Sequence, residues 1–288
     1  MPALIDLRRR IKSVRNTQQI TQAMKTVATA KLKKSQRLVM ESRPYWHTFP
    51  QFISEIIAGA RRDEHPLLIK REEKKIEGLV ITSDKGLCGA FNSNLLEEAL
   101  KFFKNKAEES EVRLVLIGKK ALTFFKKHPF PYDRTYAGQI EKLTVEDLTE
   151  LAQYLIQLYV LERIDAAYII YNEFKSILAP RLTITKILPL EVTNQNDYPY
   201  FSVSDWEPYL KIILNAFVPQ YVENHILHSF YESLAAEQAS RMMAMENATQ
   251  NAEELISDLT LVLNKMRQTS ITKELLEIMT AVEALSGK

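Results

Sequence analysis

The segment Ser83–Asn92 (Ser-Asp-Lys-Gly-Leu-Cys-Gly-Ala-Phe-Asn) comes nearest to a ligand-binding or catalytic motif. It lies between a predicted strand and a predicted helix, where glycines can bring backbone N–H groups close to a phosphate. Its spacing is Gly-x-x-Gly, which matches neither the dinucleotide fingerprint nor the phosphate-loop motif. We therefore favour a structural interpretation, in which Gly86 and Gly89 permit a tight turn and Asp84 or Asn92 caps the following helix.

The cysteine and the histidines do not form a recognisable catalytic set. Cys88 is the only cysteine, no histidine lies in its segment, and a small buried side chain is its simplest interpretation. His225 and His228, with Glu232 one turn further on, could place three metal ligands along one helix face, but a solvated helix surface is the favoured interpretation. The sequence contains no His-Glu-x-x-His and no Gly-x-Ser-x-Gly motif. It predicts no catalytic residue, no metal site and no cofactor.

The Ser83–Asn92 turn belongs to a central region, residues 61–207, in which predicted strands and helices alternate. Short apolar runs predict the strands, and helices are expected over 92–106, 118–127 and 145–161. The strands are expected over residues 77–82, 112–117, 132–136, 166–171 and 182–188. Such βαβ units predict a Rossmann-like, doubly wound α/β domain. Lysines follow Gly118, where a dinucleotide-binding fold usually places an acid, and this further disfavours nucleotide binding.

Two segments without glycine or proline flank this region, from Ala3 to Arg43 and from Gln220 to Ser286. At about 1.5 Å per residue, helices of these lengths would measure roughly 60 Å and 100 Å. Apolar, small or polar residues that could form a packing seam recur every three or four positions. They are Leu4, Leu7, Ile11, Val14, Gln18, Thr21, Met24 and Ala28, then Ala236, Ser240, Met243, Asn247, Leu255, Leu259, Val262 and Met266. We predict that residues 1–60 and 208–288 form a long antiparallel coiled coil.

The two long segments carry opposite charge, which the net charge of +2 for the whole chain conceals. Residues 1–43 contain eleven Lys or Arg against two acids, a balance of +9. Residues 220–288 contain ten acids against five basic residues, a balance of −5. This asymmetry favours pairing between the two ends of the chain.

The end of the second segment is apolar around most of the helix circumference. The residues concerned are Ile271, Leu275, Leu276, Ile278, Met279, Val282 and Leu285. Because the second helix is the longer one, its end is expected to extend beyond Met1 as a single helix. An apolar single helix needs cover on several sides, so we predict a surrounding sleeve from another protein.

Composition and the termini indicate a folded protein that is not exported. Of 288 residues, 46% are hydrophobic and 26% are charged, which is typical of globular proteins. No apolar run approaches the roughly 20 residues that cross a bilayer, and the N-terminus lacks a signal-peptide pattern. A single cysteine excludes an internal disulfide and fits a reducing compartment.

Four strings of residues together resemble the γ subunit of F-type ATP synthases. The first is Ile20–Leu32 (Ile-Thr-Gln-Ala-Met-Lys-Thr-Val-Ala-Thr-Ala-Lys-Leu), and the second is the Ser83–Asn92 turn. The others are Ser240–Thr249 (Ser-Arg-Met-Met-Ala-Met-Glu-Asn-Ala-Thr) and Asn264–Leu275 (Asn-Lys-Met-Arg-Gln-Thr-Ser-Ile-Thr-Lys-Glu-Leu). The strings occur in the family's order and spacing, so the resemblance covers essentially the whole chain.

The resemblance implies a rotor, the central stalk of the F1 sector. Its paired helices would stand inside a ring of three α and three β subunits, and the central α/β domain would be a foot on the ε subunit and the membrane c-ring. Rotation would couple ATP synthesis or hydrolysis to hydrogen ion or other ion transport, and the chain itself would not be an enzyme. A bacterial setting is expected because the chloroplast relatives' inserted cysteine pair is absent. The chain would then be a peripheral protein on the cytoplasmic side of the cell membrane.

The resemblance also assigns contacts to particular residues. Arg267 and Gln268 match residues that contact a loop of β. The basic stretch with Met24, Lys25, Lys31, Lys33 and Lys34 lies in the part of the family that faces acidic levers of β. The tip residues Ile271, Leu275, Ile278, Met279 and Val282 would turn in the sleeve of the ring. The aromatic residues Tyr198, Tyr200 and Phe201, with Trp206, are expected to contact the membrane ring or ε.

Two other classes of function agree with part of the sequence. A basic helix pair could bind nucleic acid, but residues 1–43 contain no aromatic side chain for base stacking, and the acidic C-terminal helix would lie alongside. A nucleotide-dependent enzyme built on the α/β domain is the other alternative. Neither class explains two helices of this length.

Overall fold

The computed structural model describes residues 2–59, 65–176, 180–190 and 210–286. The chain divides into two compact units. We call Met1–Ala28 with Met242–Lys288 the helical-pair unit, and Thr29–Arg241 the sheet unit.

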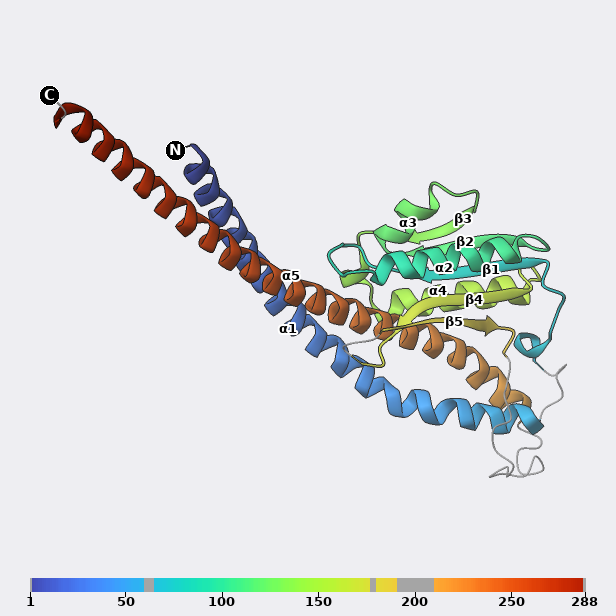
Figure 1. Cartoon of the computed structure of the whole chain (residues 1–288). Helices are drawn as coiled ribbons and strands as arrows, with labels where there is room; N and C mark the ends of the chain where they lie inside the picture. Colours follow the sequence, from blue (N-terminus) through green and yellow to red (C-terminus); the bar gives the residue numbers. More distant parts are fainter. Residues whose placement is uncertain (1, 60–64, 177–179, 191–209, 287–288) are drawn as a thin grey trace. The chain divides into compact units, whose positions relative to one another are not determined.

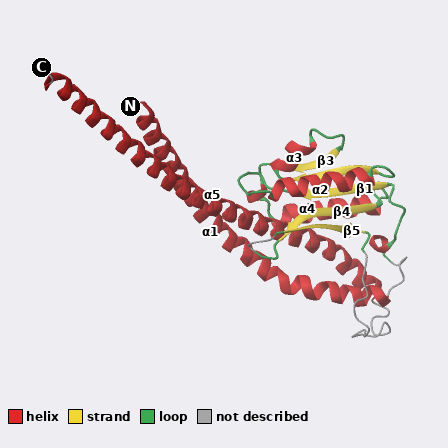
Figure 2. Cartoon of the chain, in the orientation of Figure 1, coloured by secondary structure: helices red, strands yellow, loops and turns green. Residues whose placement is uncertain are grey.

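A five-stranded sheet organises the sheet unit (Figures 1 and 2). Its strands are β1 (Lys75–Ile81), β2 (Glu111–Ile117), β3 (Tyr132–Tyr136), β4 (Ala166–Glu173) and β5 (Arg181–Leu188). Their order is β3-β2-β1-β4-β5, and all neighbours are parallel except β5, which is antiparallel to β4. Each strand lies within two residues of its predicted range, and the predicted doubly wound α/β fold is confirmed.

Helices cover both faces of this sheet. They are α2 (Phe91–Lys106) and α3 (Lys119–Phe125) on one face, and α4 (Val145–Val160) with the first part of α5 (Leu210–Ser286) on the other. Val80 and Leu114 pack towards α2 and α3, whereas Leu79 and Val115 pack towards α4 and α5. Two short 3-10 helices, η1 (Pro66–Leu68) and η2 (Ile140–Lys142), lie in the connections. A sheet with apolar side chains on both faces needs both helix layers.

Local sequence explains the placement of these helices. A Cβ atom on Gly78 of β1 would come within 2.2 Å of the Phe103 ring, so the absence of a side chain lets α2 approach the sheet. At the start of α4, Thr144 and Asp147 form a capping box, in which the Thr144 N–H donates to Asp147 Oδ2 at 2.8 Å. Both features hold helices that bury a core face of the sheet.

The two long helices, α1 (Pro2–Gly59) and α5, extend further than the segments free of proline. Helix α1 continues through Pro44 and Pro50, and α5 begins before Pro219, so both helices extend over nearly the whole of the segments 1–60 and 208–288. A proline removes one helix hydrogen bond and costs about 3 kcal/mol. Around Pro219 that cost is offset by packing, since Val218 and Val222 are fully buried in the core of the sheet unit.

In the helical-pair unit α1 and α5 run antiparallel, as predicted. Thr21 Oγ1 lies 2.8 Å from Thr249 Oγ1, and Lys25 forms an ion pair with Glu246 three residues earlier on α5. We call the line of side chains between the two helices the seam. All predicted seam residues of α1 are partly or fully buried, namely Leu4, Leu7, Ile11, Val14, Gln18, Thr21, Met24 and Ala28.

The seam of α5 agrees with its prediction in part, because Met243, Leu259 and Met266 are half-buried, but it differs at three other positions. Ile256 and Leu263 are half-buried, whereas the predicted residues Leu255 and Val262 are 40% and 48% exposed. Asn247 is also exposed. Leu255-Ile256 and Val262-Leu263 are pairs of adjacent apolar residues, and helical spacing alone does not decide which member of each pair faces a partner.

Candidate functional site

The Ser83–Asn92 turn follows the carboxyl end of β1 and is held by its own side chains. Asn92 Nδ2 donates to Ser83 Oγ at 2.8 Å, and the Ser83 N–H donates to Asn92 Oδ1 at 3.0 Å. Cys88 is 2% exposed, and burial raises the pKa of its thiol, so its interpretation as a small buried side chain is confirmed. Leu87 at the tip of the turn is exposed and has a φ of 62°.

The carboxylate of Asp84 uses the backbone donors that a phosphate at this edge would need. Oδ1 accepts hydrogen bonds from the N–H groups of Lys119 at 2.9 Å and Gly138 at 2.7 Å, and Oδ2 accepts one from Ile140 at 3.1 Å. Lys119 is the first residue of α3, so Asp84 caps α3 and not the helix that follows its own turn. The capping prediction is therefore wrong, because the partner of Asp84 comes from a distant part of the chain.

Helix α5 lies at the position where an open parallel sheet usually binds a ligand. That position is the carboxyl edge, at the point where the strand order reverses. Here the reversal lies between β1 and β4. Arg241 of α5 donates to the carbonyl oxygens of Lys85 at 3.2 Å and Gly86 at 3.3 Å, in the turn after β1. The same guanidinium donates to Glu237 Oε1 at 2.7 Å.

A second group of polar contacts holds the segment after β4. Glu232 Oε2 accepts a hydrogen bond from the Phe174 N–H at 2.7 Å. Arg43 of α1 donates from Nη2 to the Phe174 carbonyl at 3.0 Å, and the same nitrogen lies 3.5 Å from Glu232 Oε1. Burial raises the pKa of Glu232, while the hydrogen bond from Phe174 and the charge of Arg43 oppose that rise. We call Glu232, Glu237 and Arg241, with the backbone groups that they bind, the edge joint.

His225 and His228 do not form the solvated surface that was the favoured prediction. They are 5% and 6% exposed, and their rings lie 4.7 Å and 4.4 Å from the Trp46 ring of α1. Burial lowers the pKa of His225 to about 3, so this side chain is neutral at physiological pH. No group of three potential metal ligands was found among the described residues. The sequence pattern missed the packing because Trp46 lies far away in the chain.

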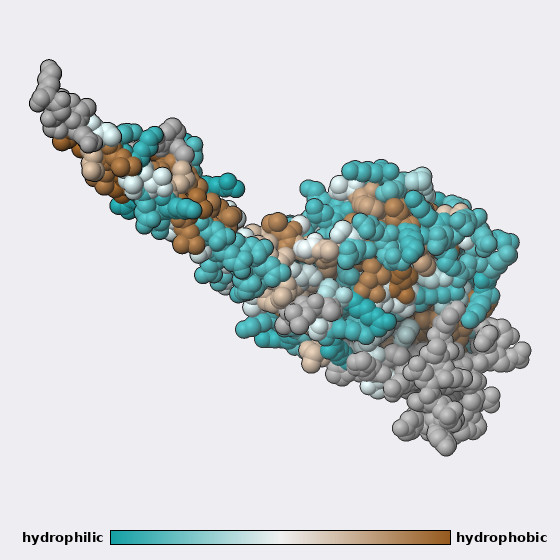
Figure 3. Space-filling view, in the orientation of Figure 1, coloured by the Kyte–Doolittle hydropathy of each residue, from teal (hydrophilic) through white to brown (hydrophobic). Residues whose placement is uncertain are grey.

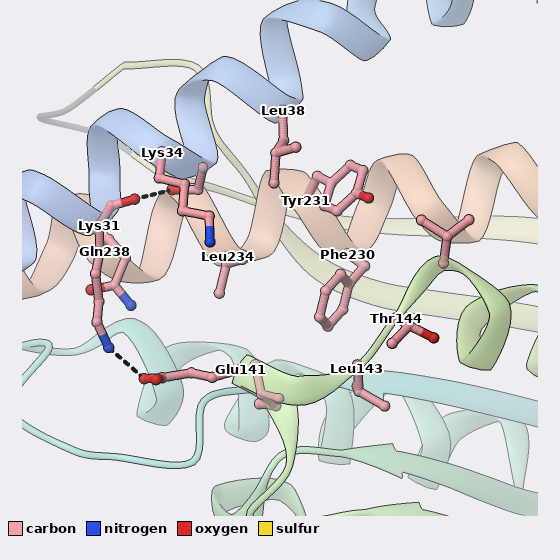
Figure 4. A pocket seen from close by; sticks show the side chains of 13 residues that line it. Lys31, Lys34, Leu38, Glu141, Leu143, Thr144, Phe230, Tyr231, Leu234 and Gln238 are labelled. Atoms are coloured by element: carbon pink, nitrogen blue, oxygen red, sulfur yellow. Dashed lines mark hydrogen bonds and ion pairs between the residues drawn. The ribbon is translucent and has the colours of Figure 1, made fainter.

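The basic stretch of α1 borders a cavity of about 330 Å³ within the sheet unit (Figure 4). Lys31 Nζ lies 2.6 Å from Glu141 Oε1 of η2, across one end of the cavity. Lys33 and Lys34 are exposed, and Lys34 lines the cavity. The remaining lining is largely apolar and includes Leu38, Leu143, Phe230, Tyr231 and Leu234.

The end of α5 carries exposed apolar side chains, as predicted. Every described side chain from 271 to 282 is exposed, and the apolar ones include Ile271, Leu275, Ile278, Met279 and Val282 at 46–66%. Figure 3 shows hydrophobic side chains on this part of the surface. Within the helical-pair unit the end of α5 reaches past the start of α1 (Figure 1), so the expected single-helix extension is confirmed. Arg267 and Gln268 are exposed one turn before this tip.

Comparisons with known proteins decide the family. A family profile described as ATP synthase matches residues 3–285. The ATP synthase gamma chain of Desulforudis audaxviator is 40% identical over 99% of this chain and all of its own length. The gamma chain of Solibacter usitatus is 41% identical and covers 99% of each chain. This chain belongs to the ATP synthase gamma-chain family.

Solved structures agree with this assignment. The central stalk of Tetrahymena thermophila mitochondrial ATP synthase is 25% identical, with a TM-score of 0.58, and covers 80% of this chain and 99% of that one. A chain of the Euglena gracilis mitochondrial enzyme in its third rotational state has a TM-score of 0.69 at 21% identity, covering 99% and 95%, and shows the same fold. The chain is a rotary central-stalk subunit of F1Fo ATP synthase.

The predicted contact residues of this gamma chain fall into three groups. Arg267, Gln268, Lys33, Lys34 and the tip residues are exposed. Lys25 and Lys31 are partly buried and paired with Glu246 and Glu141 within the chain, and Met24 lies in the seam. The aromatic residues Tyr198, Tyr200, Phe201 and Trp206 lie outside the described residues. In the described part of the chain, no helix is long and apolar enough to span a bilayer.

The sequence did not bring the residues of the edge joint together. Glu237 counted only towards the acidic balance of the C-terminal segment, and Arg241 only as part of a family string. Glu232 was considered only as a third metal ligand beside His225 and His228 and within the same acidic balance. A local signal does exist, because Glu237 and Arg241 are one helical turn apart and lie among small residues. A charge pair flanked by alanine and serine indicates a helix face on which another backbone can approach closely.

Proposed function

We propose that this gamma chain is non-catalytic and acts as the shaft inside a ring of three α and three β subunits. The observation that carries the proposal is the exposed apolar tip over residues 271–282. Exposed apolar side chains on several sides of one helix favour a surrounding protein surface. Contacts that are apolar and non-directional resist rotation less than fixed hydrogen bonds do.

The contacts with β are proposed to lie on two exposed patches. The first is Arg267 and Gln268, which we assign to a loop of β. The second is the basic stretch of α1, which attracts acidic side chains of β through long-range electrostatics. Within it Lys33 and Lys34 are exposed, whereas Lys25 and Lys31 have acidic partners in their own chain, so we expect Lys33 and Lys34 to contribute most.

The α/β domain is proposed to be the foot that meets the ε subunit and the membrane c-ring, with Tyr198, Tyr200 and Phe201 at that contact. The complex would be attached peripherally on the cytoplasmic side of the cell membrane. Its rotation would couple ion transport to ATP synthesis or hydrolysis at the β subunits. The gamma chain would provide neither a cofactor site nor a catalytic residue.

Assembly with purified α and β subunits tests the proposal that this chain is the shaft of the complex. We expect the full chain to form an active, rotating complex with them, and Leu275→Asp with Met279→Asp to lower its ATP hydrolysis at least tenfold. Leu161→Asp, at a side chain that is 64% exposed in the sheet unit, is the matched control and should leave hydrolysis unchanged. Full ATP hydrolysis by the tip variant would contradict the proposal that a protein surface surrounds the end of α5.

The contacts with β are tested separately. Arg267→Ala with Gln268→Ala should lower ATP hydrolysis several-fold without preventing assembly, whereas Lys265→Ala, an exposed residue of the same helix, should not. Lys33→Gln with Lys34→Gln should lower torque, and the loss should shrink as salt is raised, because exposed charges are screened. Unchanged coupling and torque in the lysine variant would contradict the proposed electrostatic contact with β.

A further inference from the structure

A rotor that carries torque needs a fixed angle between its foot and its shaft helix. Apolar packing holds two surfaces together but is not directional, so by itself it permits sliding and twisting. Hydrogen bonds constrain both distance and angle. In the sheet unit, α5 makes both kinds of contact with the α/β domain. Leu214, Val218 and Val222 pack on the face of the sheet, and the edge joint bonds α5 to the carboxyl edge.

The hydrogen bonds between the edge joint of α5 and the α/β domain go to backbone groups of the domain and not to its side chains. Arg241 binds the carbonyl oxygens of Lys85 and Gly86, and Glu232 binds the N–H of Phe174. Lys85 follows β1 and Phe174 follows β4, and these neighbouring parallel strands lie in the middle of the sheet. The joint therefore fixes α5 to the part of the domain that has strands on both sides.

The charged residues of the joint are buried. Glu232, Glu237 and Arg241 are 2%, 7% and 8% exposed. Burying ionised groups is costly unless they are paired and hydrogen-bonded, and here each of the three has at least one such partner. A well-packed apolar contact would often be at least as stable. Arginine differs from an apolar residue in that its planar fork binds two acceptors in a fixed direction.

We propose that Glu237 and Arg241, with Glu232, form the torque-bearing joint between the α/β domain and helix α5. The carboxyl-edge crevice, which in other doubly wound folds receives a ligand, is used here to bind the chain's own shaft helix. Glu237 positions the Arg241 guanidinium, and Arg241 donates hydrogen bonds to two carbonyl oxygens of the turn after β1. Torque would then pass from the foot into α5, which continues without a break from Leu210 to Ser286. The inference deepens the rotary function by assigning it positioning residues.

Torsional stiffness in the assembled complex tests the joint. A bead is attached through a cysteine at the exposed position Glu108, in a chain with Cys88→Ala, while the α–β ring is immobilised. Stiffness is read from the angular fluctuations of the bead during pauses. We expect Arg241→Met to lower the torsional stiffness at least twofold. Arg241→Lys should have a stiffness between those of the parent and Arg241→Met. Lysine can reach Glu237, but it lacks the planar guanidinium that binds two carbonyl oxygens.

ATP hydrolysis without load should stay within about twofold of the parent, because the contacts proposed for catalytic coupling lie elsewhere in the chain. Lys101→Met is the matched control, since Lys101 belongs to an exposed ion pair with Glu98 on α2. Parental stiffness in Arg241→Met would overturn the proposal. Equal stiffness in Arg241→Met and Arg241→Lys would overturn the role of the guanidinium fork.

Hydrogen exchange on the full, unassembled chain provides a second measurement that does not depend on rotation. Arg241→Met should speed amide exchange in residues 85–90 at least tenfold, and Glu232→Met, which removes the acceptor, should do the same for the Phe174 amide. The amides of Val115 and Ile169 in the core strands should keep their parental rates. Unchanged amide exchange of residues 85–90 in Arg241→Met would refute the proposed joint. If the chain fails to assemble with α and β, the proposed function fails, and the exchange data still decide whether the joint exists.

Discussion

The two units of this chain bury their side chains in different ways. In the helical-pair unit only Thr21, Ala28, Met245 and Ala252 are buried among the described residues, and they lie along one narrow seam. In the sheet unit two cores fill both faces of a five-stranded sheet. The apolar side chains of α5 from 271 to 282 are exposed, whereas those of β1 are buried.

This difference means that the two units depend on different interactions for their stability. The sheet unit has enough apolar burial to hold its own fold, since hydrophobic stabilisation grows with the apolar area removed from water. The seam is narrow, and it contains polar residues, which lower the stability of a coiled coil. The helical-pair unit is thus the region that leaves more of its apolar surface exposed, and substitutions in the two units should behave differently.

The largest difference is expected from equivalent truncations in the two units. Phe103→Ala removes a fully buried ring that packs against Gly78 and Phe130, and should lower the free energy of unfolding by about 3–5 kcal/mol. Leu275→Ala, at a side chain that is 56% exposed, should change it by less than about 0.5 kcal/mol. Urea unfolding of the isolated chain measures both, and comparable losses would contradict the division described above.

The next effect depends on pH and concerns Glu77 of β1. This side chain is 1% exposed, and neither carboxylate oxygen accepts a hydrogen bond from the described residues. Burial, reinforced by the nearby charge of Asp133, raises its pKa from 4.5 to about 8. Between these values the folded chain keeps a proton that the unfolded chain has lost, so stability falls as pH rises, by up to about 1.4 kcal/mol per pH unit.

Glu77→Gln should remove this dependence and make the chain more stable than the parent above pH 8. Urea unfolding at pH 6, 7, 8 and 9 measures the slope. Glu109→Gln, at an exposed residue of the same unit, is the control and should leave the slope unchanged. A parental slope in Glu77→Gln would show that this carboxyl is ionised in the folded chain.

A smaller effect is expected at the seam. Thr21→Val with Thr249→Val replaces a hydrogen-bonded polar pair by apolar side chains of similar shape. Replacing both partners together leaves no unpaired group at that contact, so we expect the helix pair to be stabilised by about 1 kcal/mol. Amide exchange of residues 14–28 should slow accordingly, while exchange in the sheet unit stays the same. Faster exchange would mean that the threonine pair supports the seam.

The smallest effect is expected for the ion pair between Lys25 and Glu246. Each side chain is 31% exposed, so solvent and salt screen the attraction. Lys25→Ala should destabilise the helix pair by at most about 1 kcal/mol at low salt, and the difference should vanish in 1 M salt. Lys12→Ala, at an exposed position of the same helix, is the control for the general charge effect.

Much of the fold could be predicted from local patterns. The runs Glu77–Thr82 and Val112–Ile117 predicted β1 and β2 because buried parallel strands are nearly continuous in apolar residues. The spacing of Leu4, Leu7 and Ile11 predicted the seam face of α1 because one helix face repeats every three to four residues. The exposed tip was also predictable, since apolar residues all around a helix cannot all face one partner helix.

The site was less predictable, because its contacts join segments that are far apart in the chain. Arg241 binds a turn some 155 residues earlier, and Asp84 caps a helix whose first residue is Lys119. Trp46 turns His225 and His228 from a predicted solvated face into a buried one. Sequence periodicity contains no information about these partners, because it reports only how residues on one element relate to each other.

The amino-acid sequence by itself determined the order and type of the elements, the charge of the two ends and the apolar tip, since these depend on local preferences and composition. Only the tertiary structure decided which of two adjacent apolar residues entered the seam on α5, how a helix continued past Pro219, and where Glu232, Glu237 and Arg241 were buried. The physical reason is that the free energy of a buried residue or charge depends on the partner that packs against it. In this gamma chain that partner is the carboxyl edge of its own sheet.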